Sequence, residues 1–156
     1  MGLLEYRKKR HFQTTPEPKG GRKKGGKEPI FVIQKHHART LHYDLRLEIR
    51  GTLKSWAVPK GPPKKIGEKH LAIQTENHPL DYAKFEGIIP KGEYGAGTVK
   101  IYDSGTFVNL KPDSLSKCLK KGTLEFRLEG KKLKNSYALV HFKEKNWLWI
   151  KVRQKK

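Results

Sequence analysis

One stretch of alternating residues decides the fold of this chain: Leu41-His42-Tyr43-Asp44-Leu45-Arg46-Leu47-Glu48-Ile49. Successive side chains on a β-strand point to opposite faces, so the polar residues of this stretch share one face and the apolar residues share the other. The apolar face is expected to lie in a hydrophobic core. The polar face then presents an imidazole, two carboxylates and a guanidinium in a row outside that core.

The rest of the sequence has the same strand-like texture. Short runs of β-branched and aromatic residues between turn residues predict further strands, which lie at 30–33, 53–58, 71–75, 98–102, 106–110, 124–128, 137–142 and 147–152. Asp103-Ser104-Gly105 is interpreted as the turn of a hairpin, and only residues 112–121 predict a helix. A series of about eight short strands with one short helix is typical of a mostly β sandwich or barrel.

The charge of the chain indicates a polyanionic partner. Its 156 residues include 35 Lys and Arg against 15 Asp and Glu, a formal net charge of +20. An excess of this kind is typical of proteins that bind nucleic acid. Residues 1–29 are rich in Lys, Arg, Gly and Pro and poor in aliphatic residues, so we expect a flexible basic N-terminal arm there and a folded domain over residues 30–156.

Cysteine content and hydropathy bear on the compartment. The single Cys118 permits no internal disulfide, which is typical of a reducing compartment. The N-terminus lacks the apolar stretch of a signal peptide, and no apolar run approaches the roughly 18 residues of a membrane span. We therefore expect an intracellular, cytoplasmic protein without membrane attachment.

The polar face of the alternating stretch predicts a metal site. Residues two apart on a strand face are separated by roughly 6.5 to 7 Å along the strand, so the side chains of His42 and Asp44 can converge on one ion. A third ligand is available from His36 or His37, and the spacing does not choose between them. Two imidazoles and one carboxylate leave coordination positions open, as catalytic sites do, and they favour manganese, cobalt or zinc over magnesium.

Arg46 lies one step further along the same face. A guanidinium beside a metal is suited to binding a phosphate oxygen, so the order His, Asp, Arg indicates phosphate chemistry. The alternative is a solvated strand face whose polar residues merely avoid the core. His78 has the corresponding alternative of an ordinary surface histidine.

Several further segments belong with this stretch. They are Phe31-Val32-Ile33-Gln34-Lys35-His36-His37-Ala38-Arg39-Thr40, Ser55-Trp56-Ala57-Val58-Pro59-Lys60-Gly61-Pro62, Asn77-His78-Pro79-Leu80-Asp81-Tyr82, Phe85-Glu86-Gly87-Ile88-Ile89-Pro90, Gly92-Glu93-Tyr94-Gly95-Ala96-Gly97 and Trp147-Leu148-Trp149-Ile150-Lys151. Together they resemble the 3'-phosphoesterase domain of bacterial DNA ligase D, the end-joining ligase, from about Tyr6 to Lys151. With no polymerase or nucleotidyltransferase module in the sequence, the chain resembles a stand-alone form of that domain.

The resemblance implies a fold and an activity. The fold is a single closed or nearly closed β-barrel. The activity is manganese-dependent: a phosphodiesterase step removes a 3'-terminal ribonucleoside, and a phosphomonoesterase step then removes the 3'-phosphate to leave a 3'-hydroxyl for repair. The implied substrates are DNA primer-template 3' ends, including ends with a terminal ribonucleotide, and the implied partners are a separate DNA ligase and polymerase.

The resemblance also assigns residues by matching positions. The metal ligands would be His36, His42 and Asp44. Arg46 and His78 would grip the scissile phosphate. The other positions expected at the active site or in contact with substrate are Tyr82, Gln34, Lys60, Arg10, Glu17 and His70.

Two positions depart from the family pattern. The family usually has Arg-Asp-Phe where this chain has Arg10-His11-Phe12. Since the acidic position at Glu17 is tied to ribonucleoside removal, the change at His11 bears on the diesterase more than on the monoesterase. His70 stands where an arginine is usual, which bears on a phosphate contact.

Two other classes of function compete with an end-trimming enzyme. A non-catalytic nucleic-acid-binding barrel explains the net charge equally well, but it gives no reason for His, Asp and Arg side chains to share one face. A metal-dependent nuclease that cleaves internally would yield fragments rather than trimmed ends.

Overall fold

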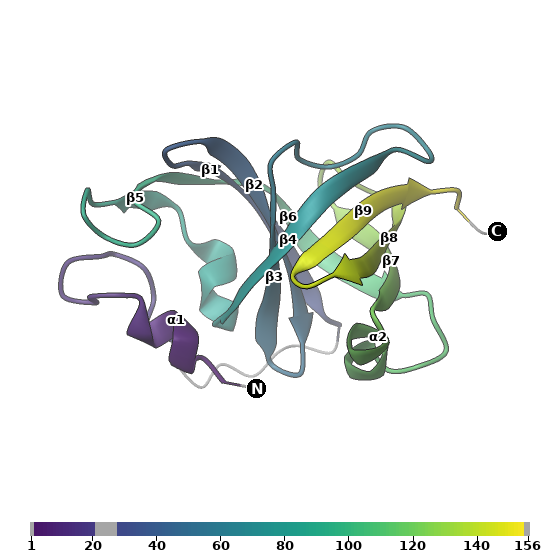
Figure 1. Ribbon diagram of the computed structural model, residues 1–156, viewed down its shortest axis with the longest axis horizontal. Helices are drawn as coiled ribbons and strands as arrows, with labels where there is room; N and C mark the ends of the chain where they lie inside the picture. The colour runs from purple at the N-terminus through teal and green to yellow at the C-terminus, as the bar shows by residue number, and fades with distance from the viewer. Residues whose placement is uncertain (1, 21–27, 155–156) are drawn as a thin grey trace.

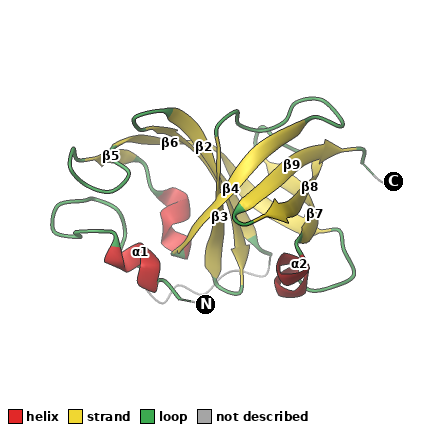
Figure 2. Cartoon of the chain, in the orientation of Figure 1, coloured by secondary structure: helices red, strands yellow, loops and turns green. Residues whose placement is uncertain are grey.

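Eight strands close into an antiparallel barrel in the order β1-β2-β3-β4-β9-β8-β7-β6, because β6 pairs with β1 as well as with β7 (Figures 1 and 2). This computed structural model describes residues 2–20 and 28–154. The barrel strands are β1 (Ile30–His37), β2 (Leu41–Ile49), β3 (Thr52–Val58), β4 (Lys69–His78), β6 (Gly97–Asn109), β7 (Thr123–Gly130), β8 (Ser136–Lys143) and β9 (Asn146–Val152). A further short strand, β5 (Gly87–Ile89), adds to β6 outside the barrel. The prediction of a mostly β, closed barrel is confirmed.

In the part of the chain that the structure describes, three short helices accompany the strands. The helix α2 (Leu115–Lys121) lies within the range predicted from sequence, begins where the Ser114 hydroxyl accepts the Lys117 N–H, and ends at Gly122 with φ of 87°. The helix α1 (Leu4–Lys8) and the 3₁₀ helix η1 (Leu80–Lys84) were not predicted. Each has only five residues, too few for apolar periodicity to show in the sequence.

The predicted hairpin at Asp103-Ser104-Gly105 is wrong, because β6 runs through these residues as one long strand. The Asp103 carboxylate accepts the backbone N–H groups of Lys131 and Leu133 at 2.9 and 2.8 Å, so it shapes the neighbouring β7–β8 turn. A Cβ at Gly105 would lie 2.1 Å from the Glu129 carbonyl oxygen, so this glycine permits close strand approach. Gly105 therefore permits a close approach of two strands, and Asp103 stabilises a turn elsewhere in the chain.

The interior of the barrel receives apolar side chains from all eight of its strands. The alternation in β2 is confirmed, since Leu45 and Leu47 are fully buried in this cluster. The other buried members are Phe31, Ile33, Trp56, Val58, Ala72, Phe107, Cys118, Leu124, Phe126, Leu128, Tyr137, Leu139, Trp147 and Trp149. The polar face of β2 therefore lies on the outer side of the barrel wall.

A second apolar cluster covers part of that outer side. Val32, Leu53 and Val99 face outward from β1, β3 and β6, and α1, η1 and β5 pack against them. Figure 1 shows α1 and β5 on one side of the barrel and α2 on the opposite side. The wall that carries the polar face of β2 is thus covered by a layer from two distant parts of the sequence.

The N-terminal segment differs from the flexible arm expected there. Tyr6 is fully buried, and Arg10, Thr15 and Glu17 are at most 8% exposed. The segment packs because Tyr6 joins the outer apolar cluster and Arg10 pairs with acidic side chains. Residues 2–20 are therefore part of the folded unit. Residues 21–27 of the expected arm lie outside the described residues, and the boundary at residue 29 remains a prediction.

Within residues 2–20 and 28–154, none of the helices has the length and apolar character that crossing a bilayer requires.

Candidate active site

The outer faces of β1 and β2 bring the predicted polar residues together. Gln34 pairs with Asp44 and His36 with His42 across the two strands, so their side chains lie on the same side of the wall. His36, His42 and Asp44 border a cavity of about 310 Å³, which is also lined by residues of the N-terminal segment and of the stretch 75–95. The residues that line it include Arg10, Glu17, His36, His42, Asp44, Arg46, Glu76, His78, Tyr82, Tyr94 and Gly95.

Three of these residues form a candidate metal site. One ligand atom from each of His36, His42 and Asp44 lies within 4.8 Å of the others. His36 Nδ1 is 3.6 Å from one Asp44 carboxylate oxygen, and His42 Nε2 is 3.2 Å from the other. His36 is buried whereas His37 is exposed on the opposite face, so of the two only His36 lies beside Asp44.

The hydrogen bonds around the two imidazoles suit metal ligation. His36 Nε2–H donates to the Gly95 carbonyl at 2.7 Å, and His42 Nδ1–H donates to the Thr40 carbonyl at 3.3 Å. Each carbonyl fixes the tautomer that leaves the other nitrogen, the one facing Asp44, with a free lone pair. Burial acts to raise the pKa of Asp44, but the neighbouring Arg46 guanidinium lowers it, and the pKa lies well below its usual range. The donor set therefore fits a divalent ion bound by two nitrogens and one carboxylate.

Arg46 reaches the same site and is held in position by Gln34. Its Nη2 is 3.5 Å from the Asp44 carboxylate, and its Nε donates to Gln34 Oε1 at 2.7 Å. Gln34 is fully buried, and its amide donates in turn to the carbonyls of Tyr82 and Phe85. Gln34 does not border the cavity and instead contacts Arg46, and its expected role at the active site remains a prediction.

His78 lies between two guanidinium groups. Arg46 Nη1 is 3.2 Å from Nδ1 of His78, and Arg10 Nη2 is 3.4 Å from Nε2. Burial, together with these two positive charges, lowers the pKa of His78 well below its ordinary value. His78 is therefore neutral at pH 7 in the absence of substrate.

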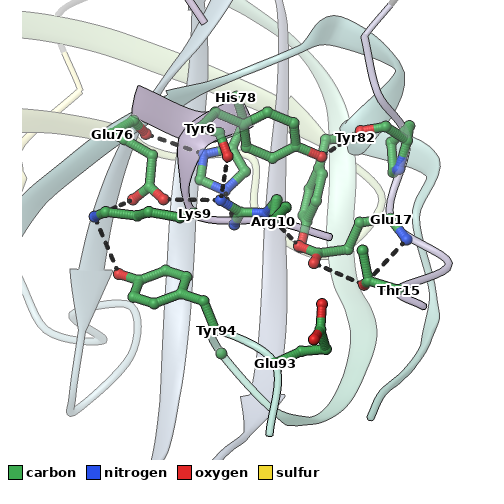
Figure 3. Close-up of polar contacts among 12 residues, drawn as sticks. Tyr6, Lys9, Arg10, Thr15, Glu17, Glu76, His78, Tyr82, Glu93 and Tyr94 are labelled. Atoms are coloured by element: carbon green, nitrogen blue, oxygen red, sulfur yellow. Dashed lines mark hydrogen bonds and ion pairs between the residues drawn. The ribbon is translucent and has the colours of Figure 1, made fainter. Parts of the chain in front are cut away.

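The other half of the cavity is built on Arg10, shown in Figure 3. Its Nε donates to Glu17 at 2.9 Å and its Nη1 donates to Glu76 at 3.0 Å. Glu17 also accepts the Tyr82 hydroxyl at 2.6 Å and the Thr15 hydroxyl at 2.8 Å. Burial raises the pKa of Tyr82 well above its ordinary value, so this phenol keeps its proton and donates a hydrogen bond to Glu17.

Glu76 and Tyr94 are site residues that the sequence interpretation did not assign. Glu76 is 6% exposed and pairs with Arg10, and the Tyr94 ring lies 5.4 Å from the same guanidinium. The signal for Glu76 was present: it stands two residues before His78 on β4, which puts both on one face. No signal of this kind marks Tyr94, because it lies in the glycine-rich loop before β6.

The structure does not bring Lys60 and His70 into this cavity. Lys60 is exposed and lines a separate cavity at the end of the barrel. His70 Nδ1–H donates to the Gly61 carbonyl at 2.6 Å, and its Nε2 is 3.2 Å from Glu68, so it braces the β3–β4 connection. Their expected contacts with substrate remain predictions.

His11 also stands apart from the buried network. Its side chain is 79% exposed, and its Nδ1 lies 3.0 Å from Glu93. A carboxylate at position 11 would repel Glu93, whereas the imidazole accommodates it. His11 therefore pairs with the glycine-rich loop and leaves the Arg10 and Glu17 contacts in place.

This fold and site define a class: a β-barrel that presents a candidate metal triad and an adjacent arginine in a cavity on its outer wall. The chain matches, over residues 34–141, the family described as DNA Ligase D 3'-phosphoesterase domain. It is also similar to proteins named multifunctional non-homologous end joining protein LigD from Pseudomonas aeruginosa and from Mycolicibacterium smegmatis, and to a multifunctional non-homologous end joining DNA repair protein LigD from Mycobacterium tuberculosis. These are 46%, 46% and 45% identical over 97%, 99% and 99% of this chain.

The chain therefore belongs to the DNA ligase D 3'-phosphoesterase domain family. It spans only 18 to 21% of the length of these relatives. Family membership makes it a phosphoesterase, and therefore a hydrolase.

Proposed function

We propose that this protein is a manganese-dependent enzyme that heals DNA 3' ends in two steps, first removing a terminal ribonucleoside and then the 3'-phosphate. The observation that carries the proposal is the position of Arg46, whose guanidinium lies 3.5 Å from Asp44 in the candidate metal triad. A positive fork next to a metal site suits one ligand above others, a phosphate that contacts both. Cobalt or zinc are the alternatives to manganese for this donor set.

His36, His42 and Asp44 would hold the ion, which would supply Lewis-acid polarisation of a phosphate oxygen. Arg46 binds a second oxygen and stabilises the negative charge that develops in the transition state. Because Gln34 fixes the Arg46 Nε–H, the Nη groups stay aimed at the cavity. This preorganisation means that little reorientation is needed when phosphate binds.

His78 serves first as a hydrogen-bonding partner of the phosphate. It is neutral without substrate, because burial and the charges of Arg46 and Arg10 disfavour the imidazolium. A phosphate dianion placed between these guanidinium groups offsets their charge and raises the pKa of His78 again. With its pKa raised, His78 can take up a proton from solvent and then donate it to a leaving oxygen.

The network around Arg10 is proposed to serve the diesterase step. Arg10 and Tyr82 tie Glu17 into the wall of the cavity opposite the metal triad. The substrate of the diesterase step carries a terminal ribonucleoside, which the substrate of the monoesterase step lacks. An extra set of polar groups beside the phosphate site suits that ribonucleoside. Glu17 offers a carboxylate for a ribose hydroxyl.

The test of the proposed function is a primer-template duplex labelled on the primer, ending in one ribonucleotide and incubated with manganese. We expect a product that comigrates with a 3'-phosphate standard and then a 3'-hydroxyl product. Binding without any change in the primer would favour the non-catalytic barrel. Internal fragments would favour the nuclease.

Glu17→Gln should slow ribonucleoside removal far more than phosphate release. The amide keeps the size of the side chain but loses its charge, and the loss of one preorganised charged group costs about 10²- to 10³-fold in turnover. Turnover is measured on ribonucleotide-ended and 3'-phosphate-ended primers at saturating DNA. The matched control is Glu125→Gln on β7, a partly exposed carboxylate outside the cavity. Equal losses on both substrates would contradict the assignment.

DNA affinity should fall steeply with salt, because each phosphate neutralised by Lys or Arg releases counterions. On duplex DNA each contact contributes a slope of about 0.9 in log affinity against log salt. Lys60→Gln is expected to reduce this slope by about one contact. Lys117→Gln on α2, which borders neither cavity, should leave it unchanged. A salt-independent affinity would refute the role of charge.

The cellular setting follows from the same proposal. The relatives are named for non-homologous end joining, and we propose the same intracellular, cytoplasmic role for this chain. A DNA ligase and a polymerase that act on the same 3' ends would be its partners.

A further inference from the structure

Tyr94 lines the cavity of the candidate active site, and the proposed function gives it no role. It lies in the glycine-rich loop between β5 and β6, next to the Arg10 side of the cavity. Tyr94 is 48% exposed, whereas the other aromatic side chains among the described residues that line this cavity are buried or partly buried. The Tyr94 ring is therefore the aromatic surface that this cavity leaves open to a ligand.

Two cations hold the Tyr94 ring in place, as Figure 3 shows for Lys9. Lys9 Nζ lies 4.6 Å from the centre of the ring and donates to its hydroxyl at 3.4 Å, and the Arg10 guanidinium lies 5.4 Å from the ring centre. Glu76 pairs with both cations, at 3.7 Å from Lys9 and 3.0 Å from Arg10. Cations near an aromatic ring are attracted by its electrons. The ring is thus positioned before a ligand binds, which lowers the entropy cost of stacking on it.

The backbone of the same loop contacts a proposed metal ligand. The carbonyl of Gly95, the residue after Tyr94, accepts the His36 Nε2–H at 2.7 Å. Gly95 has φ of 77°, a left-handed conformation that favours glycine. The loop therefore ties the position of the Tyr94 ring to that of the metal triad.

The planar part of the proposed diesterase substrate that leaves with the ribonucleoside is its base. An internal base of a strand is stacked on both faces, whereas the last base leaves its outer face uncovered. Aromatic side chains stack on bases of any sequence, because every base has a π-face. Since Glu17 in the same cavity is proposed to bind a ribose hydroxyl, a ring for the base would complete the recognition of one ribonucleoside.

We propose that Tyr94 is a specificity-determining residue of the diesterase step, and that its ring stacks on the outer face of the base of the terminal ribonucleoside. This deepens the proposed function and rests on it, since it assumes that a DNA 3' end with a terminal ribonucleotide is the substrate. The stack is made to the group that leaves, so it promotes ribonucleoside removal far more than phosphate release. It also favours cleavage at the last nucleotide, because the bases before it present no free face.

The experiment compares two primers that differ only in the terminal base. One ends in an ordinary ribonucleotide, and the other ends in an abasic analogue that keeps the ribose and its 2'-hydroxyl but carries hydrogen in place of the base. Ribonucleoside removal with manganese is measured as kcat/KM on each primer. The unmodified protein is expected to prefer the primer with the base by about 5- to 100-fold, the contribution of one base–aromatic stack.

Tyr94→Leu keeps an apolar side chain but removes the ring. It should lower kcat/KM on the primer with the base by the same factor of about 5- to 100-fold and change kcat/KM on the abasic primer little, so that the preference disappears. Tyr94→Phe keeps the ring and should keep the preference. Equal losses on the two primers in Tyr94→Leu would overturn the proposal, because the ring would then act only through the structure of the loop.

Phe142→Leu is the matched control, because Phe142 is an exposed aromatic residue on β8 that does not line the cavity. Its preference for the primer with the base should equal that of the unmodified protein. The thermal unfolding midpoint checks that each variant is folded. A preference that persists in full in Tyr94→Leu would also overturn the proposal, since the base would then be recognised elsewhere.

Phosphate release distinguishes this inference from the function on which it rests. A primer that ends in a 3'-phosphate has no leaving nucleoside, so Tyr94→Leu should slow phosphate release far less than ribonucleoside removal. If the unmodified protein removes the base-bearing and the abasic ribonucleoside at the same rate, only the role of Tyr94 is refuted. If the unmodified protein cleaves neither primer, the proposed diesterase step fails, and the role of Tyr94 in that step fails with it.

Discussion

Replacing Asp44 with asparagine is expected to abolish manganese binding and, with it, both phosphate release and ribonucleoside removal. Asp44 is the only carboxylate of the candidate triad, and it lies 3.2 to 3.6 Å from the two imidazoles and from Arg46. Removing a residue that hydrogen-bonds to a metal ligand lowers the metal affinity about 10- to 100-fold. Removing the charged ligand itself should therefore lower the metal affinity further. Calorimetric titration with manganese and turnover on both substrates measure the two effects.

The same reasoning applies to His36→Ala and His42→Ala, each of which removes one nitrogen ligand. The control is Glu48→Gln, which lies on the same strand face but outside the cavity, where its carboxylate accepts the Ile30 N–H. The amide oxygen of glutamine can still accept that hydrogen bond, so Glu48→Gln should bind manganese and turn over normally. Normal turnover in the Asp44 or His42 variants would refute the assignment of the metal site.

Arg46→Ala is expected to lower turnover of a 3'-phosphate by about 10²- to 10³-fold, the cost of removing one preorganised donor to developing charge. Manganese binding should survive, because the three proposed ligands are unchanged. Arg46→Lys should recover only part of the lost rate, since an ammonium carries the charge but cannot contact Gln34, Asp44 and a phosphate with one planar fork. Turnover at saturating DNA, measured beside manganese titrations, separates these effects.

His78→Ala should resemble Arg46→Ala in keeping the metal and losing rate. Undetectable metal binding in either variant would contradict a phosphate role. The control is Arg127→Lys, because Arg127 forms an exposed ion pair with Glu129 on β7 and takes no part in the cavity. Its turnover should be normal.

The barrel and one wall of the site could be predicted from the sequence because both depend on strand periodicity. Period-two alternation is local, so Leu45 and Asp44 were assigned correctly to opposite faces. The prediction of a turn at Asp103 and Gly105 was wrong for the same reason, since it too relied on local sequence. Both are residue types that are common in turns. Here Asp103 stabilises a turn that is distant in sequence, and Gly105 permits the close approach of a strand that is also distant in sequence.

The other wall of the site depends on contacts that no local pattern records. Arg10 meets Glu76 and His78 across more than sixty residues, and α1 is too short to show apolar periodicity. From its charge composition alone, the N-terminal segment was predicted to be a flexible arm. Tyr6 buries its ring in the outer apolar cluster, so part of that segment packs against the barrel and forms one wall of the candidate site.

The docking of this N-terminal segment would make the proposed activity depend on how firmly the segment is held against the barrel. Residues 2–20 form no strand pairing with the barrel and are held by Tyr6, by the ion pairs of Arg10 and by a few further contacts. Because Arg10 and Glu17 line the cavity, the apparent affinity for the proposed ribonucleotide end would be the intrinsic affinity multiplied by the fraction of molecules with the segment docked. By reciprocity, a bound 3' end would favour the docked segment. The proposed substrate would then help to complete the cavity that binds it.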